Sequence, residues 1–158
     1  MKALCRNLAL TPIVYCFLPN HYHILIRQDG PQRAGLLPQR LFNSYSKAYN
    51  MRYKHSGTLF EGNYKVREIT DDAHLLHLCR YIHANPVTHG LLSDVANWPH
   101  SDYMQWIDEL AGISTDRDFI DSRFASPREY REFVADYIAE RTMPEVMSKY
   151  LRSWREKM

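Results

Sequence analysis

Hydrophobic and polar positions along the 158-residue chain first predict a hairpin of two strands. Residues 13–18 are almost wholly apolar, which is typical of a short strand that is buried on both faces. Pro19 and Asn20 follow as a turn pair, and residues 21–27 return as a second strand that is rich in β-favouring side chains. The sequence therefore predicts that two histidines, His21 and His23, stand at the start of the returning strand.

Longer stretches repeat apolar side chains at helical spacing. Residues 2–10 predict the tail of a helix, and residues 33–54 predict a full helix with Pro38 near its start. Residues 63–69 alternate apolar and polar positions instead, which predicts a strand with a basic outer face. Further helices are predicted at 72–84, at 101–110, as a helix or turn at 116–124, and from Pro127 onward. A final helix is predicted after a second start signal at residues 142–145. Its apolar stripe is Val146, Tyr150 and Trp154, and its basic residues are Lys149, Arg152, Arg155 and Lys157.

The helix predicted at 72–84 carries polar residues that could take part in catalysis or metal binding. Thr70 or Asp71 provides its N-cap, and the pair Asn85 and Pro86 predicts its end, because proline disfavours helical geometry in the residue before it. Tyr81 and Asn85 are four positions apart and share one face if helical geometry persists that far. Two plainer interpretations stay open at this point: Tyr81 packs on the sheet, and Asn85 is a C-cap. His74 and His77 lie on the same stripe.

Composition places the chain among cytosolic globular proteins of one domain. Apolar residues make up 45% of it, which is enough for a hydrophobic core, and the net charge of +2 permits a nucleic-acid partner without demanding one. The three cysteines have no paired spacing, which predicts a reduced, cytoplasmic protein without disulfides. No apolar run is long enough to span a membrane, so we expect no membrane partner. We expect residues 1–100 to form the main domain and residues 101–158 a helical extension packed on it.

His21 and His23 form the first candidate site. Residues two apart in a strand point to the same face, so these imidazoles can bind one divalent cation together. The alternative is two partly buried strand histidines with ordinary hydrogen bonds. An amide oxygen from Asn85 would complete a three-ligand site with open positions, suited to Mg²⁺ or Mn²⁺ and a phosphate substrate. A tyrosine hydroxyl near such a metal, here Tyr81, could attack the phosphorus and form a covalent phosphotyrosine link.

Basic side chains that could contact nucleic-acid phosphates fall in three places. Some cluster toward the end of the helix at 33–54, two lie on the strand at 63–69, and one adjoins Tyr81. For the first group, a solvated helix face with favourable charges at its C-terminus is an equally good interpretation. The candidate DNA-binding residues are Lys47, Arg52, Lys54, Lys65, Arg67 and Arg80.

Four stretches of the chain, in order, resemble the motifs of the single-tyrosine HUH transposases. They are residues 18–26 (LPNHYHILI), 57–65 (GTLFEGNYK), 80–87 (RYIHANPV) and 98–103 (WPHSDY). Together they look like the branch of REP-associated tyrosine transposases, and the resemblance covers roughly residues 1–140. Each motif alone is of moderate specificity, whereas four in the same order are a strong indication.

The resemblance implies a fold, an activity and roles for named residues. The fold would be a ferredoxin-like α+β sandwich, with an antiparallel sheet, helices on one face and added C-terminal helices. His21 and His23 would bind the metal, Asn85 would be its third ligand in place of a glutamine seen in some relatives, and Tyr81 would be the nucleophile. Family members cleave and rejoin single-stranded DNA, often at hairpins in repeats, through a 5′-phosphotyrosine intermediate.

One departure from the family concerns the sheet. Relatives begin with a further strand and the front of the first helix, whereas Met1 here falls inside that helix. The additional strand would lie centrally, between the histidine strand and residues 63–69, so the sheet would need a substitute or a rearrangement. We therefore expect a monomer or a homodimer, with dimerisation as one way to complete the sheet. Three hypotheses follow: an active strand transferase, an inactive or domesticated binder of DNA hairpins, and a metal-binding domain without a nucleic-acid role.

Overall fold

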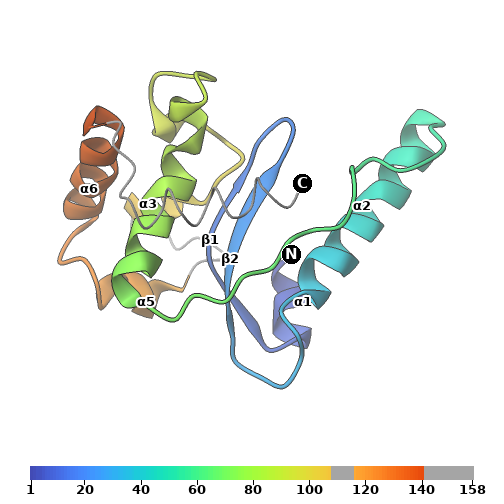
Figure 1. Ribbon diagram of the computed structural model, residues 1–158, viewed down its shortest axis with the longest axis horizontal. Coiled ribbons are helices and arrows are strands. Elements are labelled where there is room, and N and C mark those ends of the chain that lie inside the picture. Colours follow the sequence, from blue (N-terminus) through green and yellow to red (C-terminus); the bar gives the residue numbers. More distant parts are fainter. Residues whose placement is uncertain (108–115, 141–158) are drawn as a thin grey trace. The chain divides into compact units, whose positions relative to one another are not determined.

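A two-stranded antiparallel hairpin is the one sheet in residues 1–107 and 116–140, which are the residues that the computed structural model describes (Figure 1). Strand β1 spans Leu10–Phe17 and strand β2 spans Tyr22–Gln28. The turn between them is closed by a hydrogen bond of 2.8 Å from the Leu18 N–H to the carbonyl oxygen of His21. The predicted hairpin with Pro19 and Asn20 in its turn is therefore confirmed.

The remaining elements are helical. Three of them begin at an aspartate cap: Asp71, Asp94 and Asp116 each accept a backbone N–H with their side chains. The mixture of strands and packed helices confirms an α+β protein. The helices are α1 (Lys2–Asn7), α2 (Leu36–Tyr53), α3 (Asp72–Thr88), the short 3₁₀ helix η1 (Val95–Asn97), α4 (Tyr103–Ile107), α5 (Arg117–Asp121) and α6 (Pro127–Glu140).

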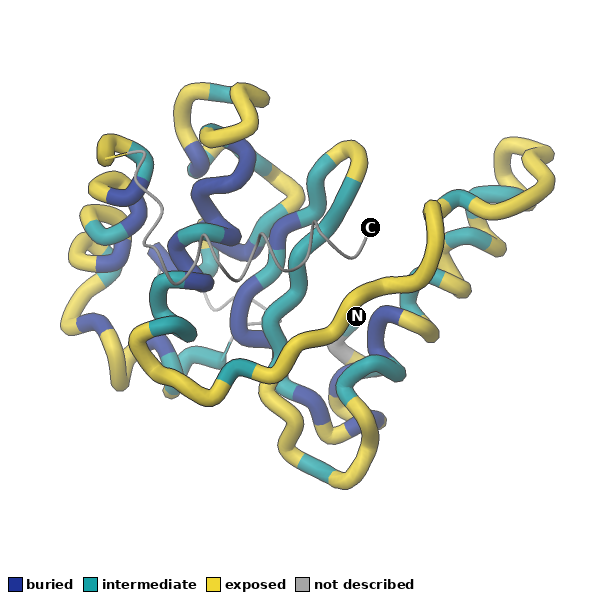
Figure 2. The backbone as a smooth tube through the Cα atoms, in the orientation of Figure 1, coloured by how far each residue is buried: buried dark blue, intermediate teal, exposed yellow. Residues whose placement is uncertain are grey.

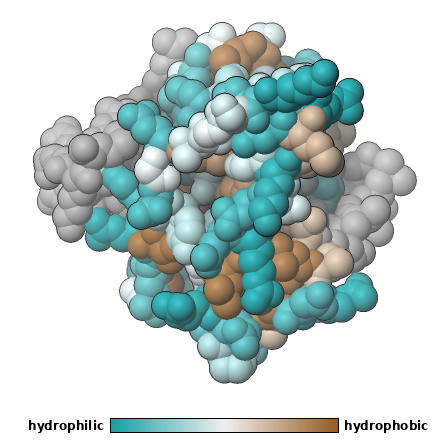
Figure 3. Space-filling view, turned by 90° about the vertical axis from the view of Figure 1, so that its right-hand side faces the viewer, coloured by the Kyte–Doolittle hydropathy of each residue, from teal (hydrophilic) through white to brown (hydrophobic). Residues whose placement is uncertain are grey.

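The chain divides into two compact units, each described here by itself. The α2 unit consists of Met1–Thr11 and Ile26–Glu68, and in it α1 packs against α2. Leu37, near the start of α2, is fully buried. Farther along the helix, Phe42 contacts Phe60 with ring centroids 5.0 Å apart, so the segment after α2 folds back along it. Hydrophilic side chains cover much of the face seen in Figure 3, with hydrophobic groups between them.

The α3 unit consists of Pro12–Leu25 and the described residues from Ile69 onward. Its core joins β1, α3 and α6, and α3 and α6 lie side by side (Figure 1). The burial pattern in Figure 2 follows this core, with the inner side of α3 and much of β1 buried. The fully buried side chains at its centre include Val14, Cys16, Ile82, Trp106, Tyr130 and Val134.

The segment after α3 folds back onto β1. The indole Nε1 of Trp98 donates a hydrogen bond of 3.0 Å to the carbonyl oxygen of Phe17, and the Phe17 N–H donates one of 2.9 Å to the carbonyl of His100. Cys16 and Ser101 form an antiparallel bridge. These contacts give β1 backbone partners on the side away from β2, which satisfies groups that would otherwise be unpaired in the core.

A buried polar network ties these elements together. His83 of α3 is fully buried between Tyr130 of α6, whose hydroxyl lies 2.6 Å from Nδ1, and Asp102, whose Oδ1 lies 2.9 Å from Nε2. Asp102 also accepts hydrogen bonds from the backbone N–H of Tyr15 at 2.8 Å and from Nε1 of Trp106 at 3.3 Å. The network thus fixes α3 against β1, α4 and α6. Its residue on α3, His83, is two positions from Tyr81.

The prediction of a strand at residues 63–69 is wrong. These residues form no strand, and the apolar positions Tyr64 and Val66 are 41% and 58% exposed. A strand requires a neighbour with which its backbone can pair, and the described residues place no strand beside this segment. The described sheet therefore has two strands rather than the larger ferredoxin-like sheet that the family resemblance implies.

The end predicted for the helix at 72–84 is also wrong, because α3 continues through Pro86 to Thr88. The helices expected within 33–54, within 116–124 and from Pro127 onward are confirmed. The helix expected over 2–10 is confirmed only as far as Asn7, because Leu10 already belongs to β1. The helix expected at 101–110 is confirmed as far as Ile107, and its predicted remainder lies outside the described residues. The predicted final helix, with Val146, Tyr150, Trp154 and its basic residues, lies outside them as well.

Candidate active site

Helix α3 sets the positions of the polar residues on one face of the α3 unit. Asp71 caps its start, where Oδ1 accepts the backbone N–H of His74 at 2.6 Å. Its end is a Schellman motif, in which Gly90 adopts a φ of 68° that suits glycine. The closing backbone hydrogen bonds, each 2.9 Å, run from His89 to Asn85, from Gly90 to Val87 and from Leu91 to Pro86.

The continued helix places Tyr81, Asn85 and His89 on one stripe, because residues four apart in a helix lie on the same face. Pro86 has no N–H to offer the carbonyl of Ile82, yet its ring is fully buried and fits inside the last turns of the helix. Helical geometry does persist to Asn85, so the condition for Tyr81 and Asn85 to share a face is met.

The hairpin brings His21 and His23 together, as their spacing predicts. Their ring centroids lie 5.1 Å apart at an interplanar angle of 85°. The side-chain oxygen of Asn20 lies 2.7 Å from Nδ1 of His21. An amide oxygen can only accept, so this contact places the proton of a neutral His21 on Nδ1 and leaves a lone pair on Nε2. His21 therefore has a nitrogen available to bind a metal.

His23 is held in a neutral state at physiological pH. Burial, followed by the nearby imidazoles of His21 and His89, lowers the pKa of His23 to about 4. Its Nε2 is shielded from solvent and has no hydrogen-bond partner among the described residues. A buried imidazole nitrogen without a partner is costly unless something binds it, so His23 fits the role of a metal ligand.

Asn85 offers a second such atom. Its side chain is fully buried, and Nδ2 donates a hydrogen bond of 3.2 Å to the carbonyl oxygen of Tyr81 one turn earlier. This bond fixes which end of the amide is the donor. The Oδ1 atom is buried without a partner among the described residues, which suits an oxygen ligand of a hard divalent cation.

The donors therefore fit a divalent metal, although the described side chains do not fully surround a metal position. The donors are two imidazoles, which bind metals in their neutral form, and one amide oxygen. Such a set leaves coordination positions open for substrate. Within residues 1–107 and 116–140, no group of three or more histidine, cysteine, aspartate or glutamate side chains is arranged to hold a metal ion. Asn85 belongs to none of these types, so the predicted set of His21, His23 and Asn85 stays a prediction.

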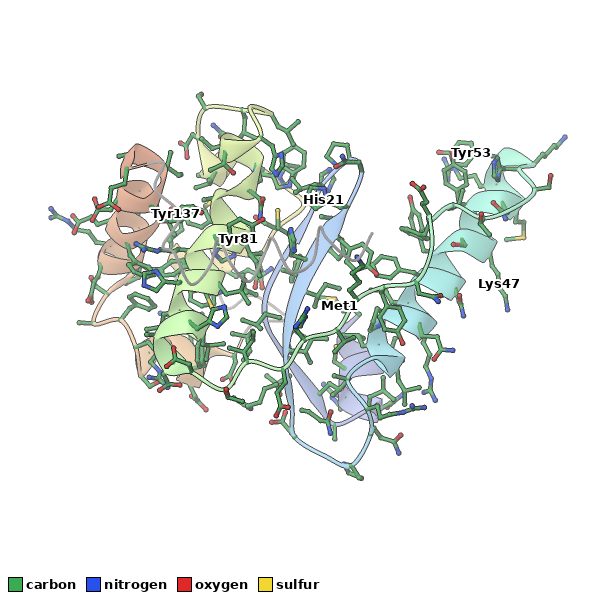
Figure 4. The ribbon with its side chains drawn as sticks, viewed as in Figure 1. Met1, His21, Lys47, Tyr53, Tyr81 and Tyr137 are labelled. Carbon is green, nitrogen blue, oxygen red and sulfur yellow. The ribbon has the colours of Figure 1, made fainter. Side chains whose placement is uncertain are left out.

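Tyr81 stands beside these donors. Its ring centroid lies 5.6 Å from that of His23 and 6.5 Å from that of Tyr137 on α6. Figure 4 labels Tyr81 on α3, Tyr137 on α6 and His21 next to the hairpin turn. Burial, followed by the neighbouring Tyr81, raises the pKa of Tyr137. Tyr81 therefore lies between His23 of the hairpin and Tyr137 of α6, with its ring in contact with both.

Arg80, the candidate DNA contact that adjoins Tyr81, packs against aromatic rings of α6. We expect a DNA contact from this residue, but its side chain is only 9% exposed. The guanidinium carbon lies 4.5 Å from the ring centroid of Phe133 and 5.1 Å from that of Tyr137. Stacking on two aromatic faces is a favourable environment for a buried cation. Arg80 thus contacts the same tyrosine of α6 that packs beside Tyr81.

The other candidate DNA-binding residues belong to the α2 unit and are exposed. Lys47 and the adjacent turn of α2 are seen in Figure 4, where Tyr53 marks the end of the helix. Arg52 lies over the ring of Tyr53 at 5.8 Å from its centroid. Exposure is what contact with DNA requires of these side chains, and it equally suits a solvated face. The full set is Lys47, Arg52, Lys54, Lys65 and Arg67.

Sequence reasoning missed His89. Its ring centroid lies 5.4 Å from that of His21, so it belongs to the same group of aromatic nitrogen donors. The spacing of four and eight residues from Asn85 and Tyr81 contained the signal. Ending the helix at Pro86 hid it, whereas Gly90 marks the true end.

Comparison with known proteins gives one relative and no match to a family model or to a solved structure. The relative is a Haemophilus influenzae protein named as a candidate REP-associated tyrosine transposase. It is 28% identical over 65% of this chain, and the match spans 64% of the relative's own length. No helix in the described parts of the chain is long and apolar enough to cross a membrane.

Proposed function

We propose that this protein is a tyrosine-dependent DNA strand transferase that cleaves and rejoins single-stranded DNA with the help of a divalent metal. One observation carries the proposal: the Tyr81 phenol lies beside His23, whose buried Nε2 has no partner, while the buried Oδ1 of Asn85 on the same helix also has none. A nucleophile next to neutral metal donors is the arrangement that phosphoryl transfer needs. The similarity to a protein named as a REP-associated tyrosine transposase supports the same reaction.

The reaction exchanges one phosphodiester for another. The Tyr81 hydroxyl loses its proton to solvent, and its oxygen attacks the phosphorus of a DNA phosphodiester. The bond from phosphorus to the 3′ oxygen of the preceding nucleotide breaks, and that oxygen takes up a proton. The products are a 5′-phosphotyrosine and a free 3′-hydroxyl. Because a covalent ester is kept, a 3′-hydroxyl can reverse the attack and rejoin DNA without a nucleotide cofactor.

His21, His23 and Asn85 would hold the metal, Mg²⁺ or Mn²⁺. When bound, it supplies a positive charge that polarises the scissile phosphate and stabilises the charge that develops in the transition state. The chain itself positions the reacting groups. Asn20 orients the His21 ring, and Asn85 is oriented by the Tyr81 carbonyl, so both ligands are fixed before substrate binds.

The substrate we propose is a DNA hairpin with a single-stranded flank, as in repeated palindromic elements. The exposed cations of the α2 unit, Lys47, Arg52, Lys54, Lys65 and Arg67, would contact its phosphates. We infer a different role for Arg80, which stacks on Phe133 and Tyr137. There it would hold α6 against the segment of α3 that carries Tyr81.

A labelled hairpin oligonucleotide tests the proposal. The protein is incubated with the DNA and Mn²⁺, and a covalent adduct is sought on a denaturing gel and mapped to a tyrosine by mass spectrometry. We expect an adduct on Tyr81 that disappears in Tyr81→Phe and persists in Tyr53→Phe, which removes an exposed phenol of α2. We also expect it to be lost in the double variant of His21→Ala and His23→Ala.

Three outcomes would contradict parts of this proposal. Binding of the hairpin without any adduct would leave a DNA-hairpin-binding protein without catalysis. An adduct that persists in the histidine double variant would remove the metal assignment. Absence of both binding and adduct would exclude a role on hairpin DNA.

A further inference from the structure

His89 is the residue that directly follows helix α3, and its ring contacts that of His21. Its imidazole is 5.4 Å from that of His21 between ring centroids, close to the 5.1 Å that separates His21 from His23. The neighbouring His89 contributes to lowering the pKa of both His21 and His23, after the larger effect of burial. Three imidazoles therefore gather at the place where metal binding is proposed.

We propose that His89 is an additional ligand of the metal site formed by His21, His23 and Asn85, and that it shifts the site toward transition-metal ions. This inference rests on the proposed function, because it adds a donor to the site proposed there. It assigns a role that neither the sequence motifs nor the relative's name supply.

The backbone at His89 is fixed by the end of helix α3, whereas its side chain lies at the surface. The His89 N–H donates to the Asn85 carbonyl at 2.9 Å, so the helix holds it one turn beyond Asn85 on the same face. The side chain of His89 is exposed to solvent. For a nitrogen of His89 to bind the same ion as His21, this exposed side chain would turn about its rotatable bonds.

Such a rotation is required, since no three histidine, cysteine, aspartate or glutamate side chains in the described residues already surround one point. The site would thus close upon metal binding, with two donors from the hairpin and two from the end of α3. An exposed ligand on a helix terminus can make this movement at low cost, whereas the buried His23 and Asn85 cannot.

The chemistry of the donors sets the metal preference. Imidazole nitrogen favours ions such as Mn²⁺, Co²⁺ and Zn²⁺, whereas Mg²⁺ prefers oxygen. A third imidazole therefore raises affinity for the first group more than for Mg²⁺. All four ligands are neutral, so the bound ion keeps its full charge for an anionic phosphate.

Titration of the full chain with Co²⁺, without DNA, tests the inference. Affinity is measured by calorimetry, and coordination by the visible absorption bands of Co²⁺. We expect His89→Ala to weaken Co²⁺ binding by at least about tenfold and to change these bands, with little effect on Mg²⁺ binding. His100→Ala is the matched control, because it removes an exposed imidazole whose ring contacts Trp98 instead.

The assignment is overturned by equal Co²⁺ affinity and equal spectra in His89→Ala and the unmodified protein, by an equal loss in His100→Ala, or by no Co²⁺ binding at all. The adduct assay with Tyr81→Phe separates this from the proposed function. An adduct with unchanged Co²⁺ binding in His89→Ala refutes only the ligand assignment. A Co²⁺ site that depends on His89 without any adduct refutes only the transferase.

Discussion

Nε2 of His83 lies 2.9 Å from Oδ1 of Asp102, and both side chains are fully buried. The two residues come from α3 and from the segment that precedes α4. His83 is two positions from Tyr81, so this pair fixes the helix that carries the proposed nucleophile. The same carboxylate accepts hydrogen bonds from Tyr15 of β1 and from Trp106 of α4. The pair is therefore the point at which three elements of the α3 unit are joined.

Asp102→Ala should destabilise the protein strongly. The substitution leaves three buried donors without an acceptor, which costs roughly 3–5 kcal/mol of the free energy of unfolding. Urea denaturation, followed by tryptophan fluorescence, measures this change. Asp102→Asn is the matched control, because it keeps the shape and one acceptor oxygen and should cost clearly less. Equal stability of Asp102→Ala and the unmodified protein would show that the network does not hold these elements together.

Arg80 and the rings of α6 should be coupled energetically. Arg80→Met keeps the length of the side chain but removes its charge, and Phe133→Leu keeps an apolar contact but removes the aromatic face. In a double-mutant cycle of unfolding free energies, we expect a coupling of about 1 kcal/mol, in the range of cation–π pairs that are partly desolvated. Additive effects of the two substitutions would show that the contact between the guanidinium and the ring does not stabilise the fold.

Much of the architecture near the candidate site follows from local sequence. The hairpin is encoded by an apolar run, a Pro–Asn turn and a second β-favouring run, and the spacing of His21 and His23 places both on one face. Asp71 and Ser126 mark the starts of α3 and α6 through side chains that accept backbone N–H groups. These features depend on neighbours in sequence, which is why they can be recognised without a structure.

Other features depend on residues that are distant in the chain. Residues 63–69 have the alternation of a strand, but pairing is a property of two segments, and one segment cannot report it. Pro86 indicates a helix end by its own chemistry, whereas its burial in the core and the stop at Gly90 extend α3. The same extension brings His89 to His21, and stacking on α6 withdraws Arg80 from solvent. Both contacts join residues that are far apart in the chain.

The cysteines should be unreactive in the folded protein. Burial, followed by the nearby Asp102, raises the pKa of Cys16 to about 12, and burial also raises the pKa of Cys5 and Cys79. A thiol with a pKa near 12 has only about one thiolate in ten thousand at pH 8. We expect a disulfide reagent to modify none of the three within minutes at pH 8, and all three once denaturant is added. Rapid reaction of any thiol without denaturant would show that its region opens readily.

Lys47 should contribute to DNA affinity through charge alone. Its side chain is exposed on α2, in the group of cations proposed to contact phosphates. Each phosphate contact to single-stranded DNA adds about 0.7 to the slope of log affinity against log salt concentration, so Lys47→Gln should reduce that slope by about this amount. Fluorescence anisotropy with a labelled hairpin over a series of NaCl concentrations measures it.

The matched control for Lys47 is Arg128→Gln, which removes an exposed cation of α6 whose guanidinium lies 2.8 Å from Glu132. Because that charge is already paired with a carboxylate, its loss should change neither affinity nor slope. An unchanged slope in Lys47→Gln would mean that the cations at the end of α2 are a solvated face, the alternative that the sequence leaves open. A slope that falls equally in both variants would mean that binding responds to net charge alone, because neither side chain would then mark a particular contact.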